Sequence, residues 1–343
     1  MTTGSFDADL EWCHEAVQGV SRTFAITIAE LEAPMADEIC VGYLLCRVAD
    51  TVEDSRRIPP TEQAELLRHY RRALDPESDA DVAAFREAVD EWIPEDPDVD
   101  WQVVDDAPRV VRTFRGLDAH ARESIRPPVL ELVEGMALFA ERDTDADGVR
   151  IRSEADIEEY CWYAAGTVGT LVTALVAEEA PPAVVAALER NTRPFALLLQ
   201  LVNVAKDVGS DFAEEDSVYL PGEWLEDAGV AAETIDAPEN VGAVASVVRR
   251  LTDHAAGYLD GAQAWLEVMP ETRGNTLSAW GVPFLLAAAT IRELRVRPED
   301  AVTGDGVKVS REEVHAAIDA FRGEDPSLGR LRRRILKRPL HEY

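Results

Sequence analysis

The chain has 343 residues, 46% of them hydrophobic, so it can bury a core sufficient for one large domain or two ordinary ones. Its formal net charge of −32 excludes typical nucleic-acid binding, because duplexes are bound by neutralising their phosphates with Lys and Arg. Lysine accounts for only three of the 34 basic residues, namely Lys206, Lys308 and Lys337. Many acids with so little lysine predict the solvated acidic surface of a protein from a salt-rich cytoplasm.

In chain order, apolar residues recur at spacings of three and four, the period of amphipathic helices, and strand-like alternation is nearly absent. Breaks coincide with Pro, Gly and acidic clusters, for example at residues 94–97 and 180–182. We predict one all-α domain over 1–343, with an acidic, loop-rich excursion at 76–106 and a basic C-terminal tail at 328–343. The helical segments are predicted at 8–18, 36–50, 62–74, 107–121, 128–141, 155–178, 192–212, 241–267, 277–298 and 311–322.

The cysteines and the apolar runs limit where the protein can reside. Cys13, Cys40, Cys46 and Cys161 are scattered without a CxxC pair, which favours small buried side chains over a disulfide framework. The start, MTTGSFDADLEW, has neither a basic region nor an apolar run, and no run elsewhere reaches the ~20 residues that span a bilayer. We expect a monomeric cytoplasmic protein, at most peripheral at the inner membrane face.

Two apolar helical segments are each followed by Asp-x-x-x-Asp. Asp50 and Asp54 end YLLCRVADTVED (43–54), and Asp207 and Asp211 follow FALLLQLVNVA (195–205). Positions i and i+4 share a helix face, where like charges repel. Mg²⁺ binds through a few carboxylates together with substrate phosphates, so two facing pairs could hold several Mg²⁺ ions and a diphosphate. With 66 acidic residues this spacing also arises by chance, but its placement after two apolar helices favours a metal site.

Basic residues accompany both pairs. Arg47 lies one turn before Asp50, Lys206 adjoins the first Asp of the second pair, and Arg22 lies in VSRTF ahead of the first carboxylate helix. Arginine forks fit phosphate oxygens, and lysine acts as a point charge. A simple ion pair of Arg47 with Glu53 or Asp50, and a helix-terminus contact for Arg22, remain as structural alternatives.

The segment EYCWYAAGTVGTLVTAL (159–175) is apolar and rich in small residues, which allow close helix packing or leave room for a ligand. It places Tyr160 and Tyr163 on neighbouring faces. Ordinary packing is the alternative for this segment. The nearly all-apolar helices at 195–205 and 280–291 belong inside the protein, around either a dry core or an apolar cavity.

Four blocks in order resemble the squalene/phytoene synthase family, whose members join two prenyl diphosphates head to head. The blocks are VSRTFAITI (20–28), YLLCRVADTVEDS (43–55), EYCWYAAGTVG (159–169) and LLLQLVNVAKDVGSDF (198–212), followed by YLP (219–221). The resemblance covers about residues 8–298. It implies a single-domain, all-α class I isoprenoid synthase bundle around a large apolar central cavity, and the acidic composition adds a haloarchaeal source.

The resemblance also implies roles for individual residues. Tyr163 matches a tyrosine proposed to steer proton movement or protect the cation, and Tyr43 and the four Asp residues join it as catalytic candidates. The implied Mg²⁺ ligands are Asp50, Asp54, Asp207 and Asp211, with Glu53 and Asn203 as weaker candidates. The implied substrate contacts are Ser21, Arg22, Tyr43, Arg47 and Lys206 at the diphosphate, and Phe24, Phe195 and Phe284 along the prenyl channel. Tyr160 and Gln200 are further substrate-binding candidates, and Gln200 matches a polar residue of the second carboxylate helix.

Two departures from the family pattern stand out. Many members have arginine just ahead of Tyr-x-Pro, where this chain has Asp216 and Ser217, so one diphosphate contact is lost or supplied elsewhere. Many members also carry an acid before the last Asp of the second motif, where this chain has Gly209 and Ser210.

Within the family, the first two blocks look more like squalene synthases, which condense two farnesyl diphosphates through presqualene diphosphate and reduce it with NADPH. Phytoene synthases use geranylgeranyl diphosphate without reduction and remain the alternative. A non-catalytic prenyl-lipid-binding helical protein is a further alternative, disfavoured by retention of all four Asp residues. Chain-elongating synthases usually carry Asp-Asp-x-x-Asp, which residues 50–54 do not match. The sequence contains no Gly-x-Gly-x-x-Gly fingerprint to support NADPH binding independently.

The segment RLRRRILKR (330–338) concentrates six of the 34 basic residues in this acidic chain. Leu331, Ile335 and Leu336 give it a partial apolar side. It is either an amphipathic helix that contacts anionic lipid, or a C-terminal helix docked on the protein's own acidic surface.

Overall fold

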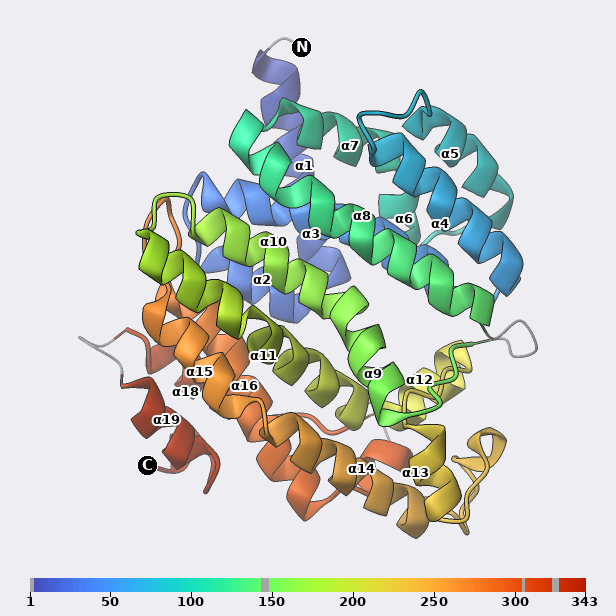
Figure 1. Ribbon diagram of the computed structural model, residues 1–343, viewed down its shortest axis with the longest axis vertical. Coiled ribbons are helices and arrows are strands. Elements are labelled where there is room, and N and C mark those ends of the chain that lie inside the picture. The colour runs from blue at the N-terminus through green and yellow to red at the C-terminus, as the bar shows by residue number, and fades with distance from the viewer. Residues whose placement is uncertain (1–2, 143–147, 304–305, 323–326) are drawn as a thin grey trace. The chain divides into compact units, whose positions relative to one another are not determined.

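The computed structural model describes residues 3–142, 148–303, 306–322 and 327–343; the side chains of residues 3, 4, 22 and 23 also lie outside this description. Within these ranges the chain is helical throughout, apart from turns and one isolated bridge between Arg150 and Val218, and the all-α prediction is confirmed (Figure 1). The chain divides into two compact units, each described separately below. The first comprises Met1–Asp147, Thr170–Ala180 and Pro270–Thr276; the second comprises Gly148–Gly169, Pro181–Met269 and Leu277–Tyr343.

The first unit is built on the long helices α3, α4 and α8. Helix α4 packs along α8, and α3 packs against both of them and against α1, α6 and α7. Its core contains large side chains with almost no accessible surface, among them Tyr70, Phe85 and Phe114. The Tyr70 hydroxyl donates to the Leu45 carbonyl at 3.1 Å, which satisfies the buried phenol. The helices are α1 (Thr3–Val20), α2 (Arg22–Ala29), α3 (Met35–Glu53), α4 (Pro60–Leu74), α5 (Val82–Val89), the 3₁₀ turn η1 (Asp90–Trp92), α6 (Val99–Asp105), α7 (Ala107–Gly116) and α8 (Ala119–Arg142).

The prediction that residues 76–106 are rich in loops is corrected, because this segment contains α5, η1 and α6. Their acids mark helix starts. The Asp81 side chain accepts from the Ala83 amide, and the Asp98 side chain accepts from the Trp101 amide. An N-cap carboxylate satisfies amides that have no partner inside the helix. Acid-rich sequence therefore signals capped short helices here, and Phe85 anchors them in the core.

The second unit is organised around α11. Helices α14, α15 and α16 pack against it, and α19 packs on α16. Trp265 of α15 contacts both α11 and α16. Its ring stacks on Phe195 of α11 with 4.5 Å between ring centres, and it meets Trp280 of α16 edge-on with 6.3 Å between ring centres. The elements are α9 (Glu154–Cys161), the π-helical turn η2 (Trp162–Gly166), α10 (Thr167–Val176, which continues into the first unit), α11 (Pro182–Lys206), α12 (Val208–Glu215), α13 (Gly222–Asp227), η3 (Ala232–Thr234), α14 (Val241–Ala256), α15 (Leu259–Val268), α16 (Leu277–Val296), α17 (Asp300–Thr303), α18 (Arg311–Asp319), α19 (Leu328–Ile335) and η4 (Leu340–Glu342).

The small residues of 159–169 serve close packing. A methyl group built on Gly169 would lie 2.9 Å from the Ala196 Cβ and 3.3 Å from the Thr192 Cγ2 of α11. Both distances are shorter than ordinary van der Waals contact, so only glycine lets α10 and α11 approach this closely. This part of the segment therefore follows the packing alternative left open by its sequence.

The four cysteines are buried thiols without disulfide partners, as predicted. Burial raises the pKa of the Cys13 thiol to about 11, which keeps it protonated near neutral pH. Across the described part of the chain, no helix combines the length and the apolar character that crossing a bilayer requires.

Candidate active site

The first carboxylate turn lies at the C-terminal end of α3. Tyr43, Arg47, Asp50 and Asp54 follow one another at spacings of four, three and four, so they share one face of the helix. All four side chains are half-buried, whereas the residues between them on the opposite face are buried in the first unit. The face predicted from the sequence is therefore present, with the phenol, the guanidinium and the two carboxylates in a row.

Arg47 is held by two carboxylates. Its Nε donates to Asp100 Oδ1 at 2.7 Å, and its Nη1 lies 3.8 Å from Asp50 Oδ2. Burial opposes the charge of Arg47, but the hydrogen bond to Asp100 and the charges of both carboxylates outweigh it and raise the pKa of the guanidinium. The arginine therefore stays a fixed cation beside Asp50.

Sequence reasoning missed Asp100. This residue lies in α6, inside the segment predicted to be a loop-rich excursion, and 50 positions after its neighbour Asp50. Its ion pair with Arg47 joins α6 to the carboxylate face of α3. The alternation of Trp101, Val103 and Val104 with polar neighbours was the available signal for a docked helix, but nothing local indicates its partner.

Ser21 and Phe24 lie against the same helix. Ser21 is the N-cap of α2, and its hydroxyl accepts from the Phe24 amide at 3.2 Å. The Phe24 ring stacks on Tyr43 with 4.1 Å between ring centres. Burial raises the pKa of Tyr43 to about 12, so the phenol is a proton donor near neutral pH. The α2 candidates therefore lie beside the face of α3; the side chain of Arg22, in the same segment, falls outside the described residues.

The carboxylates of this turn are costly as anions. Burial raises the pKa of Asp50 to about 7, and the charges of Asp54 and Asp100 add to the shift while Arg47 opposes it. Burial likewise raises the pKa of Asp54. A cation placed here would reverse this cost, since an adjacent positive charge favours the carboxylate form. The turn thus has the electrostatic character of a cation-binding position.

The end of α3 is held from α4. The Gln63 side-chain amide donates to the Glu53 carbonyl at 2.7 Å and to the Ser55 carbonyl at 3.0 Å, which satisfies C-terminal carbonyls of the helix. Glu53 itself is buried, with 7% exposure, and directly precedes Asp54. Its role as a metal ligand stays a prediction.

The second carboxylate turn lies in the other unit, where the helix is interrupted. Helix α11 ends at Lys206, Asp207 adopts φ −109° and ψ 12°, and α12 begins at Val208. The Asp211 amide still donates to the Asp207 carbonyl at 2.9 Å, so the two residues remain one turn apart. The predicted spacing therefore survives the break, and the combination of both Asp pairs into one metal site stays a prediction.

Lys206 and Asp207 form an ion pair through the lysine ammonium and the carboxylate. Next to it, the Val307 amide donates to the Lys206 carbonyl at 3.1 Å, so a loop after α17 ties down the end of α11. A Mg²⁺ ion bound by Asp207 would replace the lysine contact and leave the ammonium available to an anion. Both steps fit a position where a metal and a phosphate arrive together.

The structure explains the two departures from the family pattern. A methyl group on Gly209 would lie 2.4 Å from the Val302 carbonyl oxygen, so α12 packs directly on the backbone of α17 and excludes an acid there. Ser217 is buried and accepts from the Val149 amide at 3.1 Å. Arg150, which was not singled out from the sequence, holds the left-handed Asp216 through its carboxylate at 2.7 Å and its carbonyl.

The tyrosines of the third block have distinct surroundings. The Tyr160 hydroxyl donates to the Tyr219 hydroxyl at 3.2 Å, and their rings lie 4.8 Å apart, which joins this block to the YLP segment. Tyr163 lies in the π-helical turn η2, and its carbonyl accepts from the Thr167 hydroxyl at 2.7 Å. Such turns occur often at functional sites because one extra residue redirects the side chains.

The remaining candidates vary in exposure. Phe195 stacks on Trp265 with 4% of its surface exposed, and Phe284 has no exposed surface. Gln200 is half-buried on α11, whereas Asn203 is exposed. The roles of the two phenylalanines along a prenyl channel, and of Gln200 and Asn203 at the substrate and metal, stay predictions.

The donor set fits Mg²⁺ held jointly with a phosphate. Carboxylate oxygens spaced one turn apart are ligands that Mg²⁺ accepts, and the raised pKa of Asp50 marks a carboxyl that a cation would stabilise as an anion. Within the described ranges, no three His, Cys, Asp or Glu side chains converge on one point as a complete metal group.

Comparison with known proteins points to one family. The family model named squalene/phytoene synthase matches residues 17–313. Squalene synthase LSS of Botryococcus braunii is 28% identical over 263 residues, which are 74% of this chain and 53% of the alga's protein. The squalene synthase of Mus musculus is 26% identical over 294 residues, 85% of this chain and 65% of that protein. The chain thus spans about half to two-thirds of the length of these curated relatives.

Solved structures share the fold. The structure of TcSQS in complex with the ligand E5700 matches with a TM-score of 0.77 at 21% identity, over 98% of this chain and 99% of that one. A dehydrosqualene synthase in complex with a ligand matches with a TM-score of 0.63 at 20% identity, over 92% of this chain and 96% of that one. The predicted synthase-like helical fold is therefore confirmed, and at these identities the likeness concerns the fold alone.

Proposed function

The chain belongs to the squalene/phytoene synthase family, and we propose that it is a squalene synthase. In the proposed reaction it condenses two farnesyl diphosphates head to head through presqualene diphosphate, which is then reduced with NADPH to squalene. The observation that carries the prenyl diphosphate chemistry is the face of α3, where Arg47 is fixed between Asp100 and Asp50 and the half-buried Asp54 follows one turn after Asp50. The names of the relatives support the squalene product.

In the first unit, Asp50 and Asp54 would hold Mg²⁺ through their carboxylates. Arg47 would contact a diphosphate, because two carboxylates already position its guanidinium and leave further N–H donors on the fork. Burial raises the pKa of Tyr43 to about 12, so its phenol stays protonated near neutral pH and would donate a hydrogen bond to a phosphate oxygen. These groups bind and neutralise the leaving group, so departure of diphosphate from the allylic carbon becomes easier.

In the second unit, Asp207 and Asp211 would hold Mg²⁺ through the second carboxylate motif. Lys206 would turn from Asp207 to the diphosphate when the metal takes over that carboxylate. Tyr163, in the π-helical turn, would face the reacting prenyl groups and steer the proton loss from the condensed cation that closes the cyclopropane ring of presqualene diphosphate. The packed aromatic rings of α11 and its neighbours would help exclude water from the cation.

Bound Mg²⁺ supplies Lewis-acid neutralisation of the departing diphosphate. NADPH enters the proposal through the relatives named squalene synthase. Phytoene synthesis from geranylgeranyl diphosphate is the second candidate, favoured by the family name, which covers both activities.

The test is a product assay of the purified full chain. The protein is incubated in concentrated KCl with Mg²⁺ and either farnesyl or geranylgeranyl diphosphate, each with and without NADPH, and products are identified by mass spectrometry. Squalene formed only with NADPH supports the proposal. Phytoene from the C20 substrate without NADPH, and no turnover of the C15 substrate, would replace the squalene assignment with the second candidate.

Variants connect the product to the site. Asp50→Asn is expected to abolish product formation, whereas Asp96→Asn, an exposed acid in the same unit, should leave it unchanged. Wild-type protein that is folded but converts neither substrate under any of these conditions would favour the non-catalytic prenyl-lipid binder. Equal activity of Asp50→Asn and wild type would contradict the proposed role of the α3 face.

A further inference from the structure

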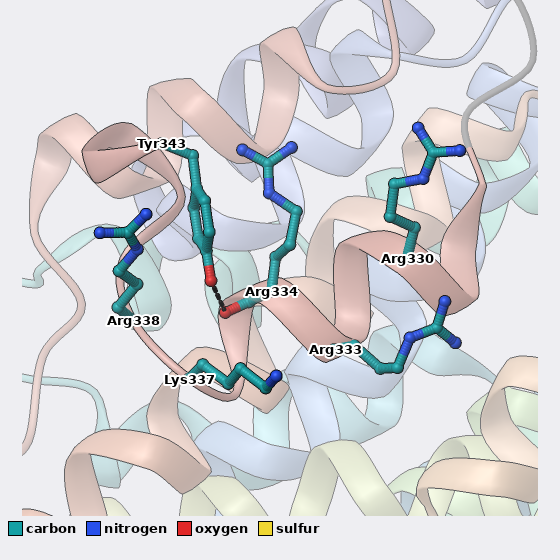
Figure 2. Close-up of a pocket in the computed structure, with 6 residues that line it drawn as sticks. All are labelled: Arg330, Arg333, Arg334, Lys337, Arg338 and Tyr343. Carbon is teal, nitrogen blue, oxygen red and sulfur yellow. Dashed lines mark hydrogen bonds between the residues drawn. The ribbon is translucent and has the colours of Figure 1, made fainter.

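A basic hollow of about 500 Å³ lies at the C-terminal end of the second unit, distant in sequence from every candidate of the active site. Figure 2 shows the side chains around it, which come from α19 and the segment that follows it. We call it the C-terminal basic hollow; it is lined by Arg330, Arg333, Arg334, Lys337, Arg338 and Tyr343. Five of the six lining side chains are cationic, in a chain whose net charge is −32.

The helix that carries the hollow is firmly docked. Leu328 and Ile335 are buried. Arg292 of α16 donates to the Ile335 carbonyl at 2.7 Å, and it forms a two-pronged ion pair with the buried Glu313 of α18 at 2.8 and 2.7 Å. On the helix itself, Arg332 pairs with Asp260 of α15 at 2.5 Å. The apolar side and one arginine therefore attach α19 to the protein.

The five cations of the hollow lack such partners. No described carboxylate lies within 4.0 Å of Arg330, Arg333, Arg334, Lys337 or Arg338, although the chain has 66 acids and pairs many of its other arginines. The predicted alternative of a tail docked on its own acidic surface thus holds for Arg332 only. Collecting unpaired like charges costs free energy, which an anion in the hollow would offset.

Tyr343 orders two of these cations. The Arg334 and Arg338 guanidinium carbons lie 4.0 and 4.1 Å from the centre of its ring, and its hydroxyl donates to the Arg334 carbonyl at 3.0 Å (Figure 2). Cation–π contacts of this kind hold a guanidinium in place without neutralising it. The hollow is therefore partly preorganised, with its N–H donors still available.

We propose that the C-terminal basic hollow binds a phosphate-bearing anion. Arginine forks and a lysine ammonium match the several oxygens and charges of a phosphate better than a single carboxylate does. The hollow has the size of a site for a small anion or a headgroup. The anion is either a soluble phosphate compound or the headgroup of an anionic lipid, and both present the same chemistry to these side chains.

The mode of lipid contact differs from that of an inserted amphipathic helix. Leu328 and Ile335 are already buried in the protein, and Leu331 and Leu336 are half-buried. Among the described residues of 328–343, Tyr343 is the only large apolar side chain that is exposed. A headgroup would therefore be bound by charge at the membrane surface, without burial of an apolar face in the acyl region. The proposal does not depend on the squalene synthase activity.

The scarcity of lysine gives a site-specific test. The chain has three lysines, so an amine-reactive reagent followed by peptide mass spectrometry reports the hollow at Lys337, the active-site candidate at Lys206 and an exposed reference at Lys308. The full chain is labelled in EDTA with inorganic pyrophosphate, with phosphatidylglycerol-containing vesicles, or with vesicles of phosphatidylcholine alone. Labelling of Lys337 is expected to slow at least about threefold with one of the two phosphate probes, while Lys308 is unchanged.

Pyrophosphate protection of Lys337 identifies a soluble anion, and protection only by phosphatidylglycerol vesicles identifies a headgroup. In both cases Arg330→Gln/Arg333→Gln should abolish protection, and Arg249→Gln/Arg322→Gln should retain it. The control pair removes the same charge from exposed arginines that pair with Glu299 and Asp319. No protection of Lys337 by pyrophosphate and none by phosphatidylglycerol vesicles, equal protection of Lys308, or protection that survives loss of Arg330 and Arg333 would each overturn the proposal.

Discussion

The Nε atom of Arg47 lies 2.7 Å from Asp100 Oδ1, so an ion pair joins the carboxylate face of α3 to the short helix α6. The contact brings together residues 53 positions apart and fixes the guanidinium one turn from Asp50. In the proposed contact with a diphosphate, Arg47 would therefore lose little conformational entropy on binding, whereas a flexible arginine would lose more.

Asp100→Asn tests this positioning. The amide keeps the shape but removes the charge that orients Arg47, so kcat/KM for the prenyl diphosphate is expected to fall about 10- to 100-fold. Asp96→Asn is the matched control, since Asp96 is an exposed acid in the turn just before α6. An unchanged kcat/KM with an unchanged melting temperature would show that Asp100 does not position Arg47 for catalysis.

Asp50→Asn should stabilise the metal-free protein at alkaline pH while it removes activity. The folded-state pKa of Asp50 is about 7, above the usual value of 3.8, because the carboxyl is buried. Between pH 4 and 7 the folded chain therefore keeps a proton that the unfolded chain has lost, and stability falls as pH rises through this window. The Asn variant lacks this loss, so its melting temperature in EDTA should exceed that of wild type at pH 8 and match it more closely at pH 4.5.

The comparison is made by thermal unfolding across pH, with Asp96→Asn as the variant that should follow wild type. The side chain of Asp50 is 27% exposed, so the gain at pH 8 is expected to be about 1–2 kcal/mol, less than a fully dry carboxyl would give. A melting temperature of Asp50→Asn below wild type at pH 8 would contradict the raised pKa.

Mg²⁺ and pyrophosphate should stabilise the protein cooperatively. Because Mg²⁺ usually binds through one or two carboxylates together with phosphate oxygens, Mg²⁺ alone is expected to raise the melting temperature little. Together with inorganic pyrophosphate the shift should exceed the sum of the separate shifts, and EDTA should remove it. Asp207→Asn should lose the joint shift; additive shifts in wild type would indicate that metal and phosphate bind independently.

Gly169→Val should destabilise the second unit by about 2 kcal/mol, because its side chain would overlap α11 at Ala196. Gly242, in the first turn of α14, has nothing within 4 Å of an added methyl group, so Gly242→Ala should be neutral or stabilise by about 0.5 kcal/mol. Urea unfolding of both variants gives the comparison. A neutral Gly169→Val would mean that α10 and α11 can move apart at no cost.

Glu313→Gln should destabilise the docking of the C-terminal helix. The change leaves the Arg292 guanidinium, 9% exposed, with a weaker partner, and the expected loss is about 3 kcal/mol. Asp319→Asn breaks the exposed pair with Arg322 and should cost less than about 0.5 kcal/mol. Similar unfolding free energies for the two variants would argue that the Arg292–Glu313 pair does not hold α18 and α16 together.

Helix existence followed from the sequence wherever apolar periodicity ran for three or more turns. The segment 62–74 became α4 (Pro60–Leu74) and 277–298 became α16 (Leu277–Val296), because one buried face per helix imposes the period. Periodicity also joined elements that the structure separates. The segment 107–121 holds the whole of α7 and the start of α8. The two helices are divided at Leu117 and Asp118, where a cap interrupts the helical hydrogen bonds without disturbing the apolar pattern.

The short helices of the acidic segment 76–106 were missed because their capping residues resemble loop residues. N-caps such as Asp81 and Asp98 look like loop residues in sequence, and their capping is visible only once the amides they satisfy are in place. The break at Asp207 and the π-helical turn at Trp162–Gly166 were likewise missed, because one displaced hydrogen bond leaves the residue pattern intact.

By itself, the sequence determined the relationships that a helix makes locally: the spacing of Asp50 with Asp54, Arg47 one turn before them, and the all-α fold that its family shares. Tertiary structure alone decided that Asp100 holds Arg47, that Tyr160 meets Tyr219, and that the five cations of the C-terminal basic hollow have no described carboxylate within 4.0 Å. Helical neighbours three and four positions apart follow from the backbone period, whereas partners dozens of positions apart depend on how buried faces pack.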